Sequence, residues 1–256
     1  MSRRRAGVDE LLEDWRDWPL ALTGRPEVLA GVPGGRTNRS YRLRGPGLDH
    51  DLLVRIHHPE SARLGIDRER ERDIVTETAR AGLGRPFLHW DARHRFAVFP
   101  WLEARAWTAD DLADAGQRSR LWPMLERLHG LVLAQTRRRY ADYLDGYWQR
   151  LETIGRIDTD LLEAWQAFRP RLRAFDEGAW KACPVHHDLV PENILDCGDR
   201  LVLIDWEYAE LGHPDIDRWS IDPGRVSEPF IVELMGWING LWERLRRIDG
   251  SAAAHR

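Results

Sequence analysis

The sequence predicts a mixed α+β fold, with a small antiparallel-sheet lobe at the N-terminus and a larger, mainly helical lobe after it. Three observations predict it. Short runs rich in β-branched and aliphatic residues gather in about the first hundred residues. Apolar residues at helical spacing dominate the rest of the chain. Two short apolar runs near residue 200 flank a turn-forming segment and predict a β-hairpin. We place the first lobe at 1–102 and the second at 103–256.

Composition fits an ordinary globular protein. The 256 residues are 43% hydrophobic and 31% charged, which allows one large or two small domains with substantial cores. The formal net charge of −4 argues against a dedicated nucleic-acid binder. No apolar run is long enough to span a membrane, and two cysteines give no disulfide framework. We therefore expect a cytoplasmic protein, and the sequence leaves its oligomeric state open.

The expected elements of the first lobe follow in order along the chain. An amphipathic helix at 8–22 precedes strands at 28–32, 40–44 and 52–57. A helix at 67–81 ends at Gly82 and Gly84, and a strand at 95–99 leads out of the lobe.

The second lobe reads as helical. Leu121, Leu125, Leu128 and Val132 are spaced by three and four residues, which predicts one helix. Further helices are expected at 142–153, 160–175 and 228–247.

The predicted hairpin and the loop before it hold the candidate metal-binding and catalytic residues. The two strands of the hairpin are 194–195 and 201–204, so folding at the intervening turn brings Asn193 opposite Asp205. An amide oxygen beside a carboxylate suits Mg²⁺. Asp188, on the same loop, could meet a substrate hydroxyl, and phosphoryl transfer needs that positioning. An isolated Asp-x4-Asn is more often a structural turn, but the hairpin and Asp205 favour the functional reading.

The run His186-x-Asp188-x4-Asn193, followed by Asp205, resembles the catalytic loop of the aminoglycoside phosphotransferase and choline kinase family, which are protein-kinase-like small-molecule kinases. Residues 205–209, Asp-Trp-Glu-Tyr-Ala, are similar to the choline and thiamine kinase branches. The resemblance implies a two-lobed kinase fold with ATP and Mg²⁺ as cofactors. It makes Asp188 the catalytic aspartate, His186 the histidine that braces the loop, and Asn193 and Asp205 the magnesium ligands.

The resemblance also extends to the nucleotide-binding segments of the first lobe. Gly34, Gly35, Thr37 and Asn38 match the pattern Gly-Gly-x-Thr-Asn, whose glycines let backbone N–H groups approach phosphate oxygens. A Gly-Gly hairpin alone would more often be a simple turn. The inter-lobe hinge, facing the adenine, is then expected at Trp101 and Leu102.

An arginine stands where protein kinases place a strand lysine. The third strand holds Arg55, and Lys181 is the only lysine of the chain. A guanidinium can bridge phosphate oxygens and a carboxylate, so we expect Arg55 to anchor the α- and β-phosphates. The family pattern makes Glu71 its carboxylate partner, with Glu69 and Glu77 as alternatives. In so arginine-rich a chain, a merely exposed strand arginine is the other reading.

The acceptor is the least determined part. The chain has 13 tryptophans, most of which we expect in the core. Trp206, Glu207 and Trp219 are the expected substrate residues, because aromatic faces and a carboxylate stabilise a cation. Asp217 is expected to support the catalytic loop. We therefore expect a small cationic alcohol such as choline or thiamine, with an aminoglycoside or a sugar as the alternative. The preference for ATP over GTP stays open.

Two other classes of protein remain. One is a catalytically inactive nucleotide-binding protein with the same fold. The other is a metal-dependent phosphohydrolase of the His-Asp type, built on the dipeptide His187-Asp188 with His129, His186, Asp205 and His213. Pro191 argues against the second, because those sites lie on helices and this segment reads as a loop.

Overall fold

The computed structural model describes residues 2–33 and 37–253, so the predicted phosphate-binding glycines Gly34 and Gly35 lie outside the described residues. The chain forms two compact units. The first comprises Met1–Met124 and Val190–Tyr208, and the second Leu125–Leu189 and Ala209–Arg256. The first unit thus adds residues 103–124 and the hairpin near residue 200 to the predicted N-terminal lobe. The lobe boundary at residue 102 stays a prediction.

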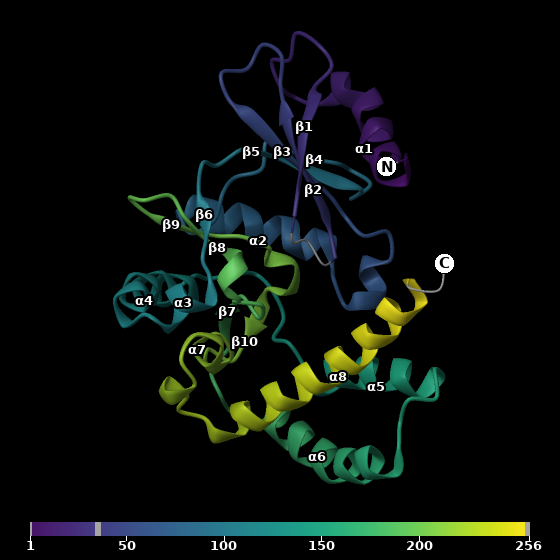
Figure 1. Cartoon of the computed structure of the whole chain (residues 1–256). Helices are drawn as coiled ribbons and strands as arrows, with labels where there is room; N and C mark the ends of the chain where they lie inside the picture. Colours follow the sequence, from purple (N-terminus) through teal and green to yellow (C-terminus); the bar gives the residue numbers. More distant parts are fainter. Residues whose placement is uncertain (1, 34–36, 254–256) are drawn as a thin grey trace. The chain divides into compact units, whose positions relative to one another are not determined.

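The first unit is built on a five-stranded antiparallel sheet (Figure 1). Its order is β1-β2-β3-β5-β4, so β3 is the central strand. The bounds are Glu27–Val32 for β1, Arg39–Arg44 for β2, Asp51–Ile56 for β3, His89–Trp90 for β4 and Phe96–Pro100 for β5. The four strands expected from the sequence are therefore confirmed. The short β4 was not anticipated.

The N-terminal segment packs against this sheet. Helix α1 (Ser2–Leu11) and the 3-10 helix η1 (Leu12–Asp17) contribute Val8, Leu11 and Leu12 to a core shared with Leu43 and Val54 of the strands. The predicted helix at 8–22 was wrong beyond η1. Trp18 is extended, with ψ of 132°, because the residue before a proline avoids the helical region.

Helix α2 spans Arg68–Arg80 and confirms the predicted helix at 67–81. The Asp67 side chain caps it by accepting hydrogen bonds from the backbone N–H groups of Glu69 and Arg70. Its buried face includes Arg68, Glu71 and Ile74, spaced by three residues. Gly82, with φ of 67°, follows the helix end as expected.

The predicted hairpin is present as β8 (Ile194–Asp196) and β9 (Leu201–Leu203), with Gly198 at φ of 89° in the turn. The short strand β6 (Arg105–Ala106) pairs with β8. One detail of the register differs from our prediction. Ile194 pairs with Leu203, and the backbone N–H of Ile204 donates to the carbonyl of Asn193 at 3.0 Å. Asn193 therefore lies opposite Ile204, one residue before Asp205.

Further helices that belong wholly or partly to the first unit are η2 (Ser61–Leu64), α3 (Ala109–Ala113), α4 (Ala115–His129), η3 (Pro191–Asn193) and η4 (Trp206–Tyr208). Helix α4 carries the predicted leucine series. The prediction was wrong for Val132, which is 95% exposed, because the helix ends before Gly130.

The second unit is mainly helical. Its helices are α5 (Tyr140–Thr153), α6 (Thr159–Glu177), α7 (Asp215–Ile221), the 3-10 helix η5 (Pro223–Arg225) and α8 (Pro229–Ala253), the last drawn in yellow in Figure 1. Helix α5 contacts both α6 and α8 around an aromatic core. Two short strands, β7 (Cys183–Val185) and β10 (Glu210–Gly212), pair antiparallel beside it. Over the described ranges, no helix is both long and apolar enough to cross a membrane.

Candidate active site

Arg55 lies on the central strand of the first unit, on the sheet face opposite Val54. Side chains alternate along a strand, so Val54 joins the core under α1 while Arg55 points to the side of α2. Its Nη2 donates to Glu71 Oε1, and its Nη1 donates to Asp205 Oδ1 at 3.0 Å. The guanidinium thus bridges two carboxylates from distant parts of the chain.

Glu71 is the carboxylate partner that the sequence left open. It is buried, and Arg68 also donates to it, at 2.6 Å. Burial disfavours its charged form, but the charges of Arg55 and Arg68 outweigh burial and lower the pKa of Glu71. Glu69 and Glu77 pair instead with arginines of α2 itself. The pairing of Arg55 with Glu71 is therefore present, while its role toward phosphate stays a prediction.

Asp205 follows directly on the hairpin end and has a strained backbone, with φ of 63°. Burial is the main reason that its pKa is raised, since the charge of Arg55 only partly offsets it. Asn193, which is buried, closes the other strand of the same hairpin. One amide and one carboxylate are hard oxygen donors, as Mg²⁺ requires, and leave room for phosphate and water ligands. Among residues 2–33 and 37–253, no group of three or more His, Cys, Asp or Glu side chains forms a metal site.

Asn38 and Glu207, which we expected to contact the nucleotide and the acceptor, bind each other inside the first unit. Asn38 Nδ2 donates to Glu207 Oε2 at 2.8 Å, and Arg68 donates both to Glu207 Oε2 at 3.1 Å and to Asn38 Oδ1 at 2.9 Å. All three side chains are buried. Burial, and then the charge of Asp205, raise the pKa of Glu207 to about 7. The expectation that Glu207 meets the acceptor is therefore corrected: its carboxylate ties α2 to the segment after β9.

Trp206 needs the same correction. Its ring is 3% exposed, and its indole Nε1 donates to the Leu203 carbonyl at 3.2 Å. An added Cβ at Gly84 would lie 3.1 Å from that nitrogen, so the ring packs closely against the end of α2. Trp206 is therefore a core residue, and its predicted contact with an acceptor has no support in the fold.

The other residues that we expect to contact the nucleotide, Thr37, Trp101 and Leu102, lie at positions that are only partly buried. Thr37 precedes β2 and is half-buried. Trp101 and Leu102, also half-buried, leave the sheet after β5, and Trp101 N donates to the Asp51 carbonyl at 2.8 Å. The guanidinium carbon of Arg42 lies 4.5 Å from the centroid of the Trp101 ring. Their contacts with a nucleotide stay predictions.

Arg85 is a site residue that sequence reasoning missed. Its guanidinium lies 4.5 Å from the centroid of the Phe99 ring, and Arg55 lies 5.7 Å from the same ring. Burial, and then Arg55, lower the pKa of Arg85 to about 9, against the opposing effect of Asp205. Within the part of the chain that the structure describes, no carboxylate forms an ion pair with it. A second cation beside Asp205 favours an anionic ligand there. The signal available in the sequence was an arginine directly after the glycines that end α2.

In the second unit, Asp217 of α7 holds the segment that carries Asp188. Its carboxylate accepts hydrogen bonds from the backbone N–H of His186 at 3.0 Å and of His187 at 3.1 Å, and His129 Nε2 lies 3.2 Å away. Asp217 is fully buried. The expected supporting role of Asp217 matches these contacts. His187 has φ of 64°, so the segment is not helical, which argues against the His-Asp phosphohydrolase.

Asp188 is half-buried, and its charge helps raise the pKa of Tyr143 of α5, although burial is the larger cause. Tyr143 shares a short hydrogen bond with Tyr147, 2.5 Å between hydroxyl oxygens. The guanidinium carbon of Arg138 lies 4.5 Å from the centroid of the Tyr143 ring. Arg138 Nε also donates a hydrogen bond to Glu210 Oε2 at 2.6 Å. Tyr143 is therefore an aromatic residue whose pKa responds to the charge of Asp188, and the sequence did not single it out. Its only signal was its position on an aromatic-rich helix.

Trp219, the remaining predicted substrate residue, lies on α7 and is half-buried against the core of the second unit. Its role toward the acceptor stays a prediction.

Comparisons with known proteins place the chain in a phosphotransferase family. The family model described as "Phosphotransferase enzyme family" matches residues 28–223, so the chain belongs to this family. Two relatives are both called Protein LicA, from Haemophilus influenzae. One is 29% identical over 200 residues, covering 73% of this chain and 56% of that protein. The other, from strain Rd, is 59% identical over 197 residues, covering 72% and 69%. The chain thus spans little more than half the length of the first.

Solved structures share the fold. A choline/ethanolamine kinase family protein from Mesorhizobium loti superposes with a TM-score of 0.68 at 21% identity, covering 96% of this chain and 87% of that one. The choline kinase LicA from Streptococcus pneumoniae gives 0.68 at 19% identity, covering 95% and 92%. A LicA structure in complex with AMP gives 0.67 at 20% identity, covering 94% and 91%. The predicted α+β, protein-kinase-like fold is confirmed.

Proposed function

We propose that the chain is an ATP-dependent small-molecule kinase that transfers the γ-phosphate to the hydroxyl of a small cationic alcohol. The observation that carries the proposal is the bridge from Arg55 to both Glu71 and Asp205. It aligns a strand cation, a helix carboxylate and the aspartate after the hairpin, which is the arrangement a kinase needs before it binds nucleotide.

On the nucleotide side, Arg55 presents a guanidinium that can exchange its bond with Asp205 for phosphate oxygens while keeping Glu71. Arg85 adds a second positive charge at the same place. Asn193 and Asp205 would hold Mg²⁺, which, when bound, neutralises charge on the phosphates. Arg68 keeps Glu71 and Glu207 in position through buried hydrogen bonds.

On the acceptor side, Asp188 would accept the proton of the attacking hydroxyl and orient it in line with the γ-phosphate. The three bonds that His186, His187 and His129 make to Asp217 limit the freedom of the loop, so Asp188 needs little reorganisation during the reaction.

The cationic acceptor is supported by solved structures of the same fold, which include proteins named as choline or choline/ethanolamine kinases. The ring of Tyr143, whose pKa is raised in part by the charge of Asp188, is already covered by the guanidinium of Arg138 at 4.5 Å, so we do not assign it to the acceptor. The solved structures therefore replace Trp206 and Glu207 as the support for this choice, and Trp219 stays a candidate. Choline is proposed ahead of thiamine.

The test is an ADP-release assay with Mg-ATP over choline, ethanolamine, thiamine, an aminoglycoside and a sugar, run on wild type and Asp188→Ala. We expect choline to be the best acceptor. Asp188→Ala should lower turnover by about a hundredfold or more with nucleotide affinity unchanged, a loss of about 3 kcal/mol of barrier stabilisation. Matched rates for choline and its neutral isostere 3,3-dimethylbutanol would reject the cationic acceptor. Unchanged turnover in Asp188→Ala would reject the catalytic assignment.

A further inference from the structure

His187, the residue directly before Asp188, has a backbone conformation that few residues other than glycine and asparagine adopt. Its φ is 64°. Over residues 2–33 and 37–253, the other non-glycine residues with positive φ are His94 and Asp205, so two of these three lie in the candidate active site. Backbone strain of this kind persists only where the surrounding contacts hold it. The contacts of His187 therefore bear on how the chain presents Asp188.

The imidazole ring of His187 is bound at both nitrogens. Nδ1 lies 3.2 Å from the Val185 carbonyl, and Nε2 lies 3.1 Å from the Tyr140 hydroxyl. Because a carbonyl only accepts, Nδ1 carries the ring proton and Nε2 accepts from Tyr140. The Tyr140 oxygen in turn accepts from the backbone N–H of His213 at 2.9 Å. Burial is the main reason that the pKa of Tyr140 is raised, so the hydroxyl keeps the proton that it donates.

Gly212 of β10 leaves the space that the His187 ring occupies. A Cβ at this position would lie 2.6 Å from His187 Nε2 and 2.5 Å from the Tyr140 hydroxyl oxygen. Both atoms belong to rigid rings in a packed interior, so neither could move aside easily. Only a residue without a side chain allows the strand to approach the two rings this closely.

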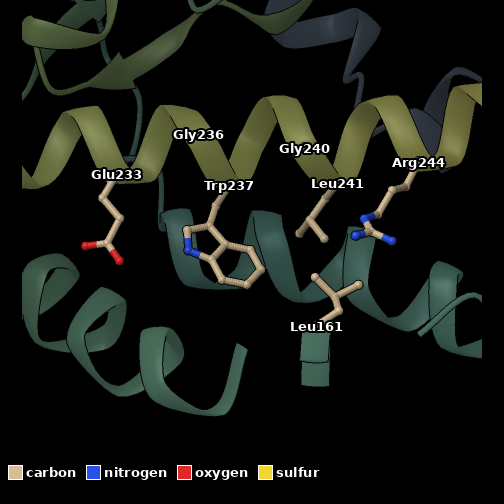
Figure 2. Close-up of a pocket in the computed structure, with 7 residues that line it drawn as sticks. All are labelled: Leu161, Glu233, Gly236, Trp237, Gly240, Leu241 and Arg244. Atoms are coloured by element: carbon tan, nitrogen blue, oxygen red, sulfur yellow. The ribbon is translucent and has the colours of Figure 1, made fainter. Parts of the chain in front are cut away.

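Tyr140 is fixed in turn by the helices of the second unit. It is the first residue of α5, and its backbone N–H donates to Asp176 of α6 at 3.1 Å. Its side chain is fully buried. Helix α6 packs on α8, where Trp237, drawn in Figure 2, stacks on Phe168 of α6 with ring centroids 4.9 Å apart. The hydroxyl that binds His187 therefore lies on a rigid support.

We propose that His187 is a positioning residue, whose ring contacts fix the main chain that presents Asp188. The inference rests on the proposed function, in which Asp188 orients the attacking hydroxyl. The angle φ of His187 relates the direction of its N–H to that of its side chain. Asp217 accepts from this N–H at 3.1 Å, and the ring contacts hold the side chain, so together they fix φ. A fixed φ sets the direction in which the chain continues to Asp188 and reduces the reorganisation that the reaction needs.

The kinetic test uses variants of His187 with Mg-ATP and the best acceptor. His187→Gly keeps the fold, because glycine adopts a φ of 64° without strain, but it removes the ring. We expect kcat to fall about 10- to 30-fold with the Michaelis constant for ATP unchanged, because only the Asp188 segment loses its support. His187→Asn, which also tolerates positive φ but is too short to reach Tyr140, should show the same loss. The control His50→Gly, at an exposed position, should keep the wild-type kcat. Wild-type kcat in His187→Gly would overturn the proposal.

A double-mutant cycle tests whether Tyr140 acts through the ring of His187. Tyr140→Phe removes the hydroxyl and keeps the buried ring, and alone it should lower kcat about 3- to 10-fold. In the His187→Gly background the same change should have no further effect on kcat, because no imidazole is left to hold. Gly212→Ala should also lower kcat, since its Cβ displaces the His187 ring, whereas Gly146→Ala, which faces open space on α5, should not. Losses that add in the double variant would show that the two residues act independently, against the proposal.

Amide hydrogen exchange gives a measurement that does not depend on kinase activity. The backbone N–H groups of residues 186 and 187 donate to Asp217. When the ring contacts are lost, in His187→Gly and in Tyr140→Phe, these two amides should exchange about tenfold faster or more, while the amides of α6 stay protected. A wild type that phosphorylates none of the acceptors would reject the proposed function, and faster exchange in both variants would still support the fixed segment. Equal exchange in wild type and both variants would reject the role of His187, whatever the acceptor assay gives.

Discussion

Arg55 Nη1 donates a hydrogen bond to Asp205 Oδ1 at 3.0 Å, across 150 positions of sequence. The same guanidinium binds Glu71, so a single side chain joins the central strand, helix α2 and the end of the hairpin. A buried arginine with two carboxylate partners is held in one geometry, and the charges of Glu71 and Asp205 outweigh the effect of burial and raise its pKa. The site is therefore ordered before any nucleotide is present.

Replacing Arg55 by alanine should weaken Mg-ATP binding. Charge-assisted hydrogen bonds contribute about 1.5–3 kcal/mol, so the dissociation constant should rise about 10- to 100-fold. Arg55→Lys should recover only part of this, because an ammonium group cannot bind Glu71 and a phosphate with a planar fork. Calorimetric titration with a non-hydrolysable ATP analogue measures the effect. Arg44→Ala, at an exposed position of β2, is the control, and equal affinities for all three variants would remove Arg55 from the nucleotide site.

Arg85 should contribute to the same binding step. Arg85→Gln removes a positive charge beside Asp205 while keeping a side chain that can pack on Phe99, and we expect nucleotide affinity to fall about 3- to 30-fold. The loss should be larger for ATP than for AMP, because only the phosphates beyond the first meet this charge in the proposed arrangement. Arg80→Gln, an exposed substitution on α2, is the matched control. The same fold-loss for AMP and ATP would assign Arg85 to the core instead.

Local patterns explain which parts of this site were predictable. The start of α2 near Asp67 and the hairpin after Asn193 are set by residues within about one turn or one hairpin, and both were predicted from the sequence. Glu71 was expected to pair with Arg55 because of the family resemblance, and not because of a local pattern. Glu207 was misassigned because its partner Asn38 lies 169 positions away. No pattern around Glu207 distinguishes a carboxylate that faces an acceptor from one buried against such a partner.

Arg85 and Tyr143, the two residues that sequence reasoning missed, also depend on tertiary contacts that local sequence patterns do not show. Arg85 is one of many arginines in the sequence, and only the approach of Phe99 and Asp205 distinguishes it. Tyr143 lies at ordinary helical spacing from Tyr147, and the charge of Asp188 affects it because α5 packs on the segment after β7, where the Tyr140 hydroxyl lies 3.1 Å from His187 Nε2. Tertiary contacts of this kind leave no periodic signal.

Asp217 should act as a positioning residue for the proposed reaction. Asp217→Asn leaves only one acceptor oxygen for the N–H groups of His186 and His187 and removes the charge near His129. We expect turnover to fall about 10- to 100-fold with little change in the Michaelis constant for ATP, because the effect is on the Asp188 segment. Asp142→Asn, on the exposed side of α5, is the control. A change confined to the Michaelis constant for ATP would contradict this role.

His57 predicts a specific dependence of stability on pH. It follows β3, is 5% exposed, and its Nδ1 lies 2.8 Å from the His94 carbonyl. Its Nε2 has no hydrogen-bond partner among the residues that the structure describes. Burial, and then the charges of Arg55 and Arg68, lower its pKa to about 3 from the usual 6.5. The folded protein therefore keeps this ring neutral where the unfolded chain protonates it.

The sign of the effect follows from proton uptake. Between pH 6.5 and about 3 the unfolded chain binds the His57 proton and the folded protein does not, so falling pH lowers the free energy of unfolding. In His57→Gln this contribution is absent. The stability advantage of wild type over the variant should therefore shrink by about 2 kcal/mol between pH 6 and pH 4.5. Urea unfolding, followed by tryptophan fluorescence at each pH, measures the difference, in which the opposite contribution of Glu207 cancels. His58→Gln, at an exposed position, should show no such change. A wild-type advantage that stays constant over this range would show that His57 is protonated in the folded protein as readily as in the unfolded chain.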